Sequence, residues 1–196
     1  MTQERILPQL MMRRPNLQGL KEMQLPEGYS LRSFCQGDVQ AWNKIIAESF
    51  DSPFDSEKFE KVMRQDAEFM PERVLFVCCN DIPVATASAW LSSKWDNSTG
   101  YLHMVGVCPG HQGKRLGYLI TLAVLEKFAE DGRTTAVLST DDFRLAALKT
   151  YLNLGFEPYL IHENQRERWK EVFEKLKRED LVEVFSEKLK RIHNYD

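Results

Sequence analysis

The stretch of sequence that decides the fold is Val105-Gly106-Val107-Cys108-Pro109-Gly110-His111-Gln112-Gly113-Lys114-Arg115-Leu116-Gly117-Tyr118-Leu119-Ile120. Its apolar beginning predicts a strand that ends at Pro109, and its apolar end predicts a helix from about Leu116. The glycines between them permit positive φ angles and the close approach of a ligand. Backbone N–H groups can therefore converge at the helix start, where phosphate binds, and Lys114 and Arg115 add two positive charges there.

Two common nucleotide-binding patterns do not fit this turn. A Walker A loop needs Ser or Thr after its lysine, but Arg115 follows Lys114, and no glycine precedes Gly113 at the required spacing. The Gly-x-Gly-x-x-Gly pattern of dinucleotide-binding folds is also missing from residues 110–117. These departures argue against a nucleoside triphosphate or a dinucleotide as the phosphate ligand.

The same stretch resembles the acetyl-CoA-binding motif of the GNAT (GCN5-related) N-acetyltransferase superfamily, Val-x-Val-x-Pro-x-x-Arg/Gln-Gly-x-Gly-x-Gly/Ala. The matching residues are Val105, Val107, Pro109, Gln112, Gly113 and Gly117. Arg115 replaces the middle glycine of the motif, so a side chain stands where the family usually leaves the backbone bare. This side chain could instead pair with a phosphate.

On the N-terminal side of the motif, the hydrophobic pattern predicts a sheet with two helices. Strands are expected at 29–34, 74–79, 84–91 and 101–107, with a tight turn at Asn80-Asp81 between the second and third. A helix is expected after Gly37-Asp38, with Val39, Trp42, Ile45, Ile46 and Phe50 on one face, and a second short helix carries Phe59, Val62 and Met63. Residues 1–27 contain Pro8, Pro15 and Pro26 and are expected to form an arm that lies on the domain.

On the C-terminal side, a helix is expected over 116–130, ended by Asp131-Gly132, and then a strand over 135–139. A further helix ends at Gly155, and a strand follows from Phe156 to Ile161. This order of elements also resembles GNAT, over roughly residues 28–161. A second family motif, Asn-x-x-Ala-x-x-x-Tyr-x-x-x-Gly-Phe, is matched by Ala147, Tyr151, Gly155 and Phe156, with Arg144 in place of Asn.

From about Glu163 the chain becomes highly charged, and apolar residues at helical spacing predict one or two amphipathic helices with a break near 178–180. GNAT domains usually end with a seventh strand, and no convincing one follows here. We therefore expect an α/β (α+β) fold: a GNAT-like mixed, mainly antiparallel sheet, flanked by helices and splayed between its fourth and fifth strands. The expected organisation is an arm (1–27), an acetyltransferase domain (28–162) and a helical extension (163–196) packed on the same domain, with a homodimer contact as the alternative.

The resemblance implies a set of cofactor-binding residues. In this family the fourth strand binds the pantetheine arm of acetyl-CoA and the following turn holds the pyrophosphate. The expected cofactor-binding residues are Val105, Gly106, Val107, Gln112, Gly113, Lys114, Arg115, Leu116, Gly117, Tyr118, Arg144 and Ala147.

Two residues are candidates for proton transfer. Tyr151 occupies the position of the tyrosine that often protonates the CoA sulfur in the family; the alternative is a packed helix residue. His103 stands where many members carry a glutamate base. An imidazole with a pKa near 6.5 could accept the amine proton, but a core histidine bonded to a neighbour explains His103 equally well. Strand alternation would place Tyr101, His103 and Val105 on one face.

Three further residues near the motifs, Cys108, Asp141 and Asp142, are candidates for chemistry. Cys108 lies beside the turn and suggests an acyl-cysteine intermediate, but no His or Asp is its neighbour in sequence, so direct transfer is favoured. Asp141 and Asp142 could orient a substrate amine, although capping of the following helix is the preferred interpretation.

The composition of the chain limits which partners, cysteine chemistry and compartment are expected. The formal net charge of −3 over 196 residues gives no indication of nucleic-acid binding. The four cysteines have no Cys-x-x-Cys spacing, which favours reduced thiols over disulfides or a metal site. No apolar run is long enough for a membrane span, and the expected compartment is cytoplasmic.

The sequence thus predicts an acetyl-CoA-dependent N-acetyltransferase that transfers an acetyl group to an amine by direct attack, without a metal. The partners expected are acetyl-CoA and an amine that the sequence does not identify. Two alternatives stay open: a CoA-binding sensor or pseudoenzyme without turnover, and an interaction protein acting through its C-terminal helices.

Overall fold

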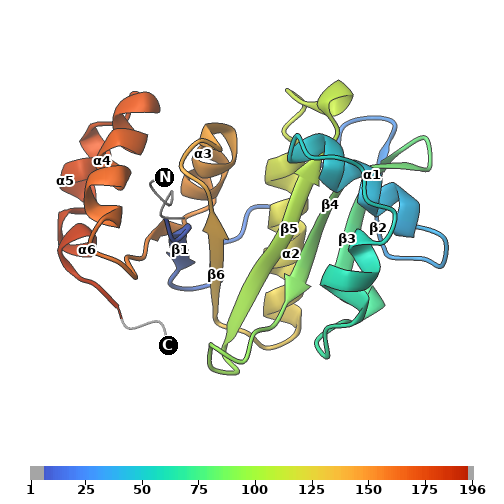
Figure 1. The fold of residues 1–196 in the computed structure, drawn as a ribbon, viewed down its shortest axis with the longest axis horizontal. Coiled ribbons are helices and arrows are strands. Elements are labelled where there is room, and N and C mark those ends of the chain that lie inside the picture. Colours follow the sequence, from blue (N-terminus) through green and yellow to red (C-terminus); the bar gives the residue numbers. More distant parts are fainter. Residues whose placement is uncertain (1–6, 194–196) are drawn as a thin grey trace, which may run out of the picture. The chain divides into compact units, whose positions relative to one another are not determined.

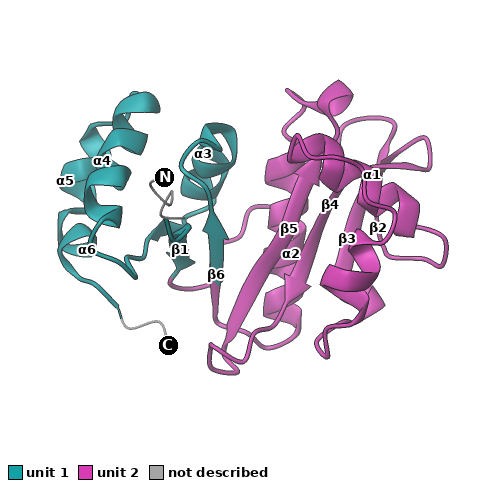
Figure 2. Ribbon diagram, viewed as in Figure 1, with its two compact units in different colours: residues 1–14, 137–196 teal, residues 15–136 magenta. Residues whose placement is uncertain are grey.

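The computed structural model describes residues 7–193 (Figure 1). Contacts along the chain divide it into two compact units, Pro15–Ala136 in one and Met1–Arg14 with Val137–Asp196 in the other (Figure 2). The described residues contain seven strands, and the pairs between neighbouring strands within each unit that have a defined register are antiparallel. The mixed, mainly antiparallel α/β fold predicted from the sequence is therefore confirmed.

The strands of the 15–136 unit follow one another in space as they do along the chain. They are β2 (Tyr29–Ser33), β3 (Val74–Cys79), β4 (Ile82–Trp90) and β5 (Thr99–Val107), in the order β2-β3-β4-β5. Between β3 and β4, Asn80 and Asp81 have φ angles of 47° and 66°, and Cys79 pairs with Ile82. Two consecutive positive φ angles are typical of a tight hairpin turn whose twist matches that of its strands.

Helix α1 (Val39–Ser49) begins where the sequence predicts it. Asp38 accepts two hydrogen bonds from the Arg32 guanidinium, at 2.6 and 2.9 Å, and a third from the backbone N–H of Cys35. These contacts fix the chain between β2 and α1. The second predicted helix is a single π-helical turn, η1 (Glu60–Arg64), followed by the short 3-10 turn η2 (Pro71–Arg73).

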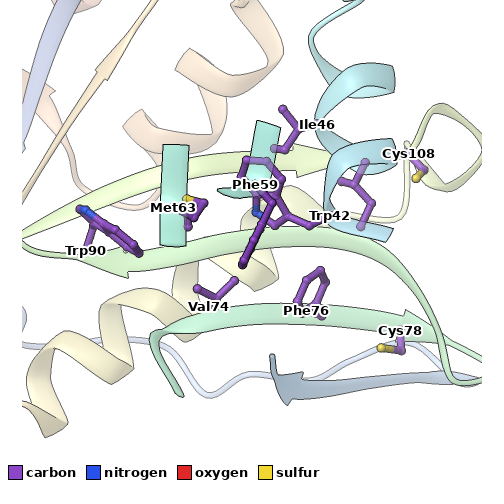
Figure 3. Packing of buried hydrophobic residues seen from close by; sticks show 10 residues of the cluster. Trp42, Ile46, Phe59, Met63, Val74, Phe76, Cys78, Trp90 and Cys108 are labelled. Atoms are coloured by element: carbon purple, nitrogen blue, oxygen red, sulfur yellow. The ribbon is translucent and has the colours of Figure 1, made fainter. Parts of the chain in front are cut away.

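The core of this unit lies between α1, η1 and one face of the strands. Figure 3 shows that Trp42 and Ile46 of α1 point toward Phe59, Met63 and the strand residues Val74, Phe76 and Trp90. The rings of Trp42 and Phe59 meet edge to face with their centroids 5.2 Å apart. Removing such side chains from water is the main stabilising contribution to this face.

Helix α2 (Leu116–Glu130) belongs to the same unit and is largely buried. Its last turn is tied to η2, because Asp131 accepts hydrogen bonds from Arg73 and Lys127 at 3.0 and 2.9 Å. Gly132 follows with a φ of 76°, a conformation in which a helix stops readily at glycine. The predicted helix end at Asp131-Gly132 is confirmed.

The second unit contains β6 (Thr135–Thr140) from Val137 onward, α3 (Leu145–Asn153), β7 (Glu157–Pro158) and β1 (Leu10–Arg14). Its strands lie in the order β6-β1-β7, and Met12 of β1 pairs with Pro158 of β7. The predicted arm thus contains a strand that lies between the two strands flanking α3. The predicted strand over 156–161 is shorter than expected, although Leu160 makes one more bridge, to Ile192.

Three helices complete the second unit: α4 (Gln165–Lys175), α5 (Asp180–Val184) and α6 (Ser186–Lys190). The break between α4 and α5 comes one residue before the predicted segment, at Lys177, whose φ is 55°. Gln165 is fully buried and bonds the carbonyl of Gln9 at 2.7 Å, and Arg168 bonds that of Pro8 at 2.8 Å. These bonds fasten the start of β1 to α4.

Within residues 7–193, no helix is both long and apolar enough to cross a membrane. The predicted splay between the strands at 99–107 and 135–140 concerns the boundary of the two units and stays a prediction.

Candidate functional site

The turn between β5 and α2 ends in an open helix N-terminus. After β5 the N–H of Cys108 bonds the carbonyl of Val84 at 2.8 Å, and the short turn η3 (Pro109–His111) follows. Gly113 has a φ of 79°, and Arg115, the residue before α2, makes no side-chain cap. The first N–H groups of a helix have no partner inside it, so those of Leu116, Gly117 and Tyr118 are available to a ligand.

This N-terminus fits an anionic group. A side chain added at Gly110 or Gly113 would meet nothing within 4 Å, so the space beside the turn is open. Gln112, Lys114 and Arg115 are exposed there. Available N–H groups, the positive end of the helix dipole and two cationic side chains together favour phosphate. The predicted set from Gln112 to Tyr118 is therefore gathered in one unit, next to the end of β5.

The backbone of Arg115 has a conformation that favours glycine, which is the residue that the family motif has at this position. Its φ and ψ are 61° and 17°, in the left-handed region that side chains other than glycine rarely adopt. Its guanidinium carbon lies 4.8 Å from the centre of the Tyr118 ring, an arrangement that holds the charge close to the first turn of α2. The chain thus keeps the backbone shape of the motif and places a cation beside the open N–H groups.

The register of β5 overturns one prediction. His103 pairs with Ser88 and Gly106 pairs with Thr86, which lies two residues from Ser88, so an extra residue is inserted in β5. Met104 lies in this bulge with a φ of 52°. The bulge interrupts the alternation, so Gly106, rather than Val105, takes the face of Tyr101 and His103. A side chain at Gly106 would come within 2.8 Å of Ser49 Oγ of α1, which explains the glycine.

His103 has an aromatic and largely apolar environment. Its ring centroid lies 5.6 Å from that of Trp90 and 5.6 Å from that of Tyr101. Burial lowers the pKa of His103 to about 4, and the Asp66 carboxylate only partly opposes this effect. The pKa near 6.5 assumed from the sequence is therefore wrong, because burial disfavours the imidazolium. At neutral pH the ring is uncharged and can accept a proton, though weakly.

Cys108 does not have the environment of a nucleophile. Its thiol is buried, and burial together with a hydrogen bond from Cys108 to the Glu48 carboxylate raises its pKa to about 11. A reactive cysteine needs the reverse, a pKa lowered by positive charge. The preference for direct transfer over an acyl-cysteine route is consistent with this geometry.

The other predicted site residues belong to the second unit. Tyr151 is buried on α3, and its ring meets that of Phe156 edge on, with centroids 5.9 Å apart. Arg144 precedes α3 and pairs with Asp141 at 2.9 Å, while Ala147 lies one turn before Tyr151. The roles of Tyr151, Arg144 and Ala147 stay predictions.

Asp141 and Asp142 do not cap α3, contrary to the preferred interpretation. No side chain caps this helix. Asp141 instead accepts hydrogen bonds from Arg144 and Gln9, and Asp142 accepts two from the Arg168 guanidinium of α4. Both carboxylates thus make contacts within the unit.

Several neighbours of the site were not found from the sequence: Tyr29, Ser88, Trp90 and Asp66. Tyr29 of β2 places its hydroxyl 2.8 Å from Nδ1 of His111 in the turn. Ser88 is fully buried, and its hydroxyl has no hydrogen-bond partner among the described residues. None of these contacts is local in sequence, so no spacing pattern could have indicated them. Across residues 7–193 no cluster of His, Cys, Asp and Glu side chains is arranged to hold a metal ion.

Comparison with known sequences identifies a family. Residues 39–156 match the sequence profile of the Acetyltransferase (GNAT) family. A mycothiol acetyltransferase from Thermobispora bispora is 31% identical over 158 residues, which are 76% of this chain and 54% of that protein. One from Kytococcus sedentarius is 29% identical over 143 residues, 70% of this chain and 48% of that protein. The chain therefore spans about half the length of these relatives.

Solved structures agree with this fold. A GCN5-related N-acetyltransferase from Sphaerobacter thermophilus superposes with a TM-score of 0.62 at 22% identity, covering 78% of this chain and 49% of that one. Another, from Kribbella flavida, gives a TM-score of 0.54 at 20% identity, covering 78% and 55%. At these identities the likeness concerns the fold.

Proposed function

Because this chain belongs to the GNAT acetyltransferase family, we propose that it transfers an acetyl group from acetyl-CoA to an amine by direct attack. The observation that carries the proposal is the open N-terminus of α2, which follows β5 directly and has Lys114 and Arg115 beside it. Such an N-terminus binds the phosphates of a cofactor. When bound, acetyl-CoA supplies the activated acyl group as a thioester.

The proposed cofactor contacts follow the order of the chain. Residues Val105, Gly106 and Val107 of β5 are proposed to bind the pantetheine arm through their backbone, as the family motif implies. The bulge leaves Val105 without a register partner on β4, whereas Gly106 and Val107 pair with that strand. The turn from Gln112 to Tyr118 binds the pyrophosphate. In the second unit, Arg144 and Ala147 are proposed to complete the contacts.

Proton transfer needs an acceptor for the amine and a donor for the sulfur. We propose that uncharged amine attacks the thioester carbon, so that the C–N bond forms as the C–S bond breaks. His103 accepts the proton that the nitrogen loses, and Tyr151 gives one to the departing thiolate. An imidazole with a pKa of about 4 cannot readily deprotonate a free alkylammonium, which favours reaction from the uncharged amine.

The acceptor is proposed only as a class, a primary amine. The relatives described above are named mycothiol acetyltransferases. The acceptor of those enzymes therefore belongs in a first panel, alongside glucosamine, spermidine and a peptide with a free N-terminus. The four free cysteines are compatible with a reducing, cytoplasmic location, which we include in the proposal.

The test begins with a calorimetric titration of acetyl-CoA into the purified chain, with free CoA and ATP as controls. Micromolar binding of acetyl-CoA and none of ATP supports the phosphate site, and absence of binding to either CoA species contradicts it. Thiol release is then measured across the amine panel. An enzyme loses turnover in Tyr151→Phe but keeps its acetyl-CoA affinity, whereas a sensor shows no turnover to lose.

The third possibility, an interaction protein acting through its C-terminal helices, is tested by surface substitutions. Deletion beyond about residue 165 would remove Arg168 and the fully buried Trp169, and so would disturb the second unit itself. Val184 is a better position, because it is 66% exposed on α5. Val184→Glu should reduce partner binding only if these helices act as an interface, while acetyl-CoA binding is unchanged.

A further inference from the structure

Asp66 follows η1 and carries a carboxylate that is held in one orientation. Trp90 Nε1 donates a hydrogen bond to Oδ2 at 3.3 Å, and the backbone N–H of Glu68 donates one to Oδ1 at 2.9 Å. Asp66 itself is exposed, whereas Trp90 is buried in the core of the unit. Short π-helical segments such as η1 are frequent beside functional sites.

This carboxylate has no cationic partner. Within residues 7–193, no Lys, Arg or His side chain forms an ion pair with Asp66. The nearest cation along the chain, Arg64, pairs with Glu60 at 3.4 Å and lies over the rings of Phe59 and Phe69. An anion that is fixed in place and lacks a counterion attracts a cation from solution.

Trp90 connects the carboxylate to the strand that carries the proposed proton acceptor. Its ring lies beside that of His103, with centroids 5.6 Å apart, and the Asp66 carboxylate affects the titration of this histidine. Ser88, paired with His103 across the strands, contributes a buried hydroxyl with no partner in the described part of the chain. Buried hydroxyls usually have a hydrogen-bond partner, which can be an ordered water molecule.

We propose that Asp66 binds the acceptor substrate through its ammonium group, and that Trp90 holds the carboxylate for this purpose. The inference rests on the proposed acetyl transfer and narrows its substrate class to amines that are positively charged in solution. Asp66 binds the protonated amine beside His103. A fraction of the bound amine loses its proton to solvent, and this uncharged form reacts. The ring of Trp90 packs against that of Phe69, with centroids 6.4 Å apart, which keeps the indole N–H donor in place.

The test compares Asp66→Asn with Asp55→Asn. Asp66 is exposed and Asp55 is partly exposed, and each accepts a hydrogen bond from the N–H two residues later, at 2.9 Å in both cases. Asparagine can keep that bond through its one amide oxygen, so each variant removes one negative charge and leaves the local turn intact. At position 66 the amide nitrogen also replaces the oxygen that accepts from Trp90 Nε1, a loss that Trp90→Phe measures separately. Asp55 lies within reach of Lys61, at 3.6 Å, and serves as the matched control.

Steady-state kinetics are measured with the alkylamine that gives the highest rate in the panel and with aniline, which is uncharged at neutral pH. Asp66→Asn should raise KM for the alkylamine about tenfold, the typical value of a charge-assisted hydrogen bond. KM for aniline and for acetyl-CoA should not change. Trp90→Phe, which removes only the indole N–H donor, should raise the alkylamine KM by a smaller factor.

Two results would overturn the inference separately from the acetyl-transfer proposal: an unchanged alkylamine KM in Asp66→Asn, or equal changes in Asp66→Asn and Asp55→Asn. In either case turnover by the wild-type chain would still support acetyl transfer. If wild-type protein binds no acetyl-CoA and acetylates no amine, the proposed function fails, and the assignment of Asp66 fails with it.

Discussion

The hydroxyl of Tyr29 lies 2.8 Å from Nδ1 of His111, and the two rings meet edge to face with centroids 5.8 Å apart. This contact joins β2, at one side of the 15–136 unit, to the turn that precedes α2. Burial raises the pKa of Tyr29, so the phenol keeps its proton and can donate it to His111. The imidazole then carries its own proton on Nε2, where it is a further donor beside the proposed phosphate site.

Tyr29→Phe removes the hydroxyl and keeps the ring. We expect acetyl-CoA affinity to fall about two- to tenfold, because one hydrogen bond that orders the turn is worth about 0.5–1.5 kcal/mol. His111→Ala should cost at least as much, since it removes both the orienting contact and the Nε2 donor. Calorimetric titration measures both effects, and wild-type affinity in Tyr29→Phe would contradict this role.

Two substitutions at Arg115 separate its charge from its backbone conformation. Arg115→Ala loses the charge and keeps a left-handed residue with a Cβ, whereas Arg115→Gly loses the charge and removes the conformational strain. Both should weaken acetyl-CoA binding several-fold. The glycine variant should be more stable than the alanine variant by about 1 kcal/mol, measured by urea unfolding. Equal stability of the two variants would show that the φ of 61° carries no strain.

A substitution at Gly100 tests how closely α2 packs against β5. A methyl group at this position would lie 2.4–2.5 Å from ring carbons of Phe128, which is itself buried. We expect Gly100→Ala to lower the free energy of unfolding by about 1–3 kcal/mol, as overpacked cores do. Gly110→Ala is the control, because its methyl group would meet nothing within 4 Å. Similar losses in both variants would refute the close contact.

His103 should make stability depend on pH. Its pKa is about 4 in the folded chain and about 6.5 in an unfolded one. Between these values the unfolded chain binds a proton that the folded chain excludes, so acid favours unfolding. This titration therefore leaves the free energy of unfolding unchanged above about pH 6.5 and lowers it as the pH falls toward 4.

The comparison is with His103→Asn, in which this titration is absent. From about pH 7 to about pH 4.5, the wild-type chain should lose about 2 kcal/mol more than the variant. Urea unfolding of both proteins measures the difference, and effects of other groups cancel in it. Parallel pH profiles would mean that His103 is solvated in the folded state.

Alkylation should distinguish the cysteines. With a pKa of about 11, Cys108 is almost entirely a thiol at neutral pH, and thiols react slowly with iodoacetamide. Cys35 is exposed and should be modified first. Peptide mass spectrometry after short labelling of folded protein gives the order. Early modification of Cys108 would contradict its high pKa and would support an acyl-cysteine intermediate.

The features predicted from the sequence are those whose determinants lie close together along the chain. The turn at 108–117, the hairpin at Asn80-Asp81 and the apolar face of α1 each depend on neighbouring residues or on helical spacing. The β1 strand was missed because its five residues, Leu10–Arg14, show no alternation and are buried by partners about 145 residues later.

The candidate site was predicted less completely, for the same reason. The bulge at Met104 arises from the register with β4, which strand alternation alone does not reveal. The low pKa of His103 results from burial by side chains of other elements. Asp66 reaches Trp90 across 24 positions of sequence, so no motif could have linked the two. Local patterns indicated the glycine-rich turn before α2, whereas the residues proposed for the acceptor side come together only in the tertiary structure.

The position of β1 between β6 and β7 has a consequence for synthesis of the protein. Leu10–Arg14 are made before residues 15–136, but their neighbours in the sheet, β6 and β7, are made after them. The same is true of Gln165 and Arg168, which bond the start of β1. Until then an apolar, strand-forming segment has no place to pair, and long-range strand pairing is slow. The 15–136 unit can form first, whereas the second unit can close only after the segments on both sides of residues 15–136 have been made, so β1 precedes the other described strands in synthesis and is among the last of them to be buried.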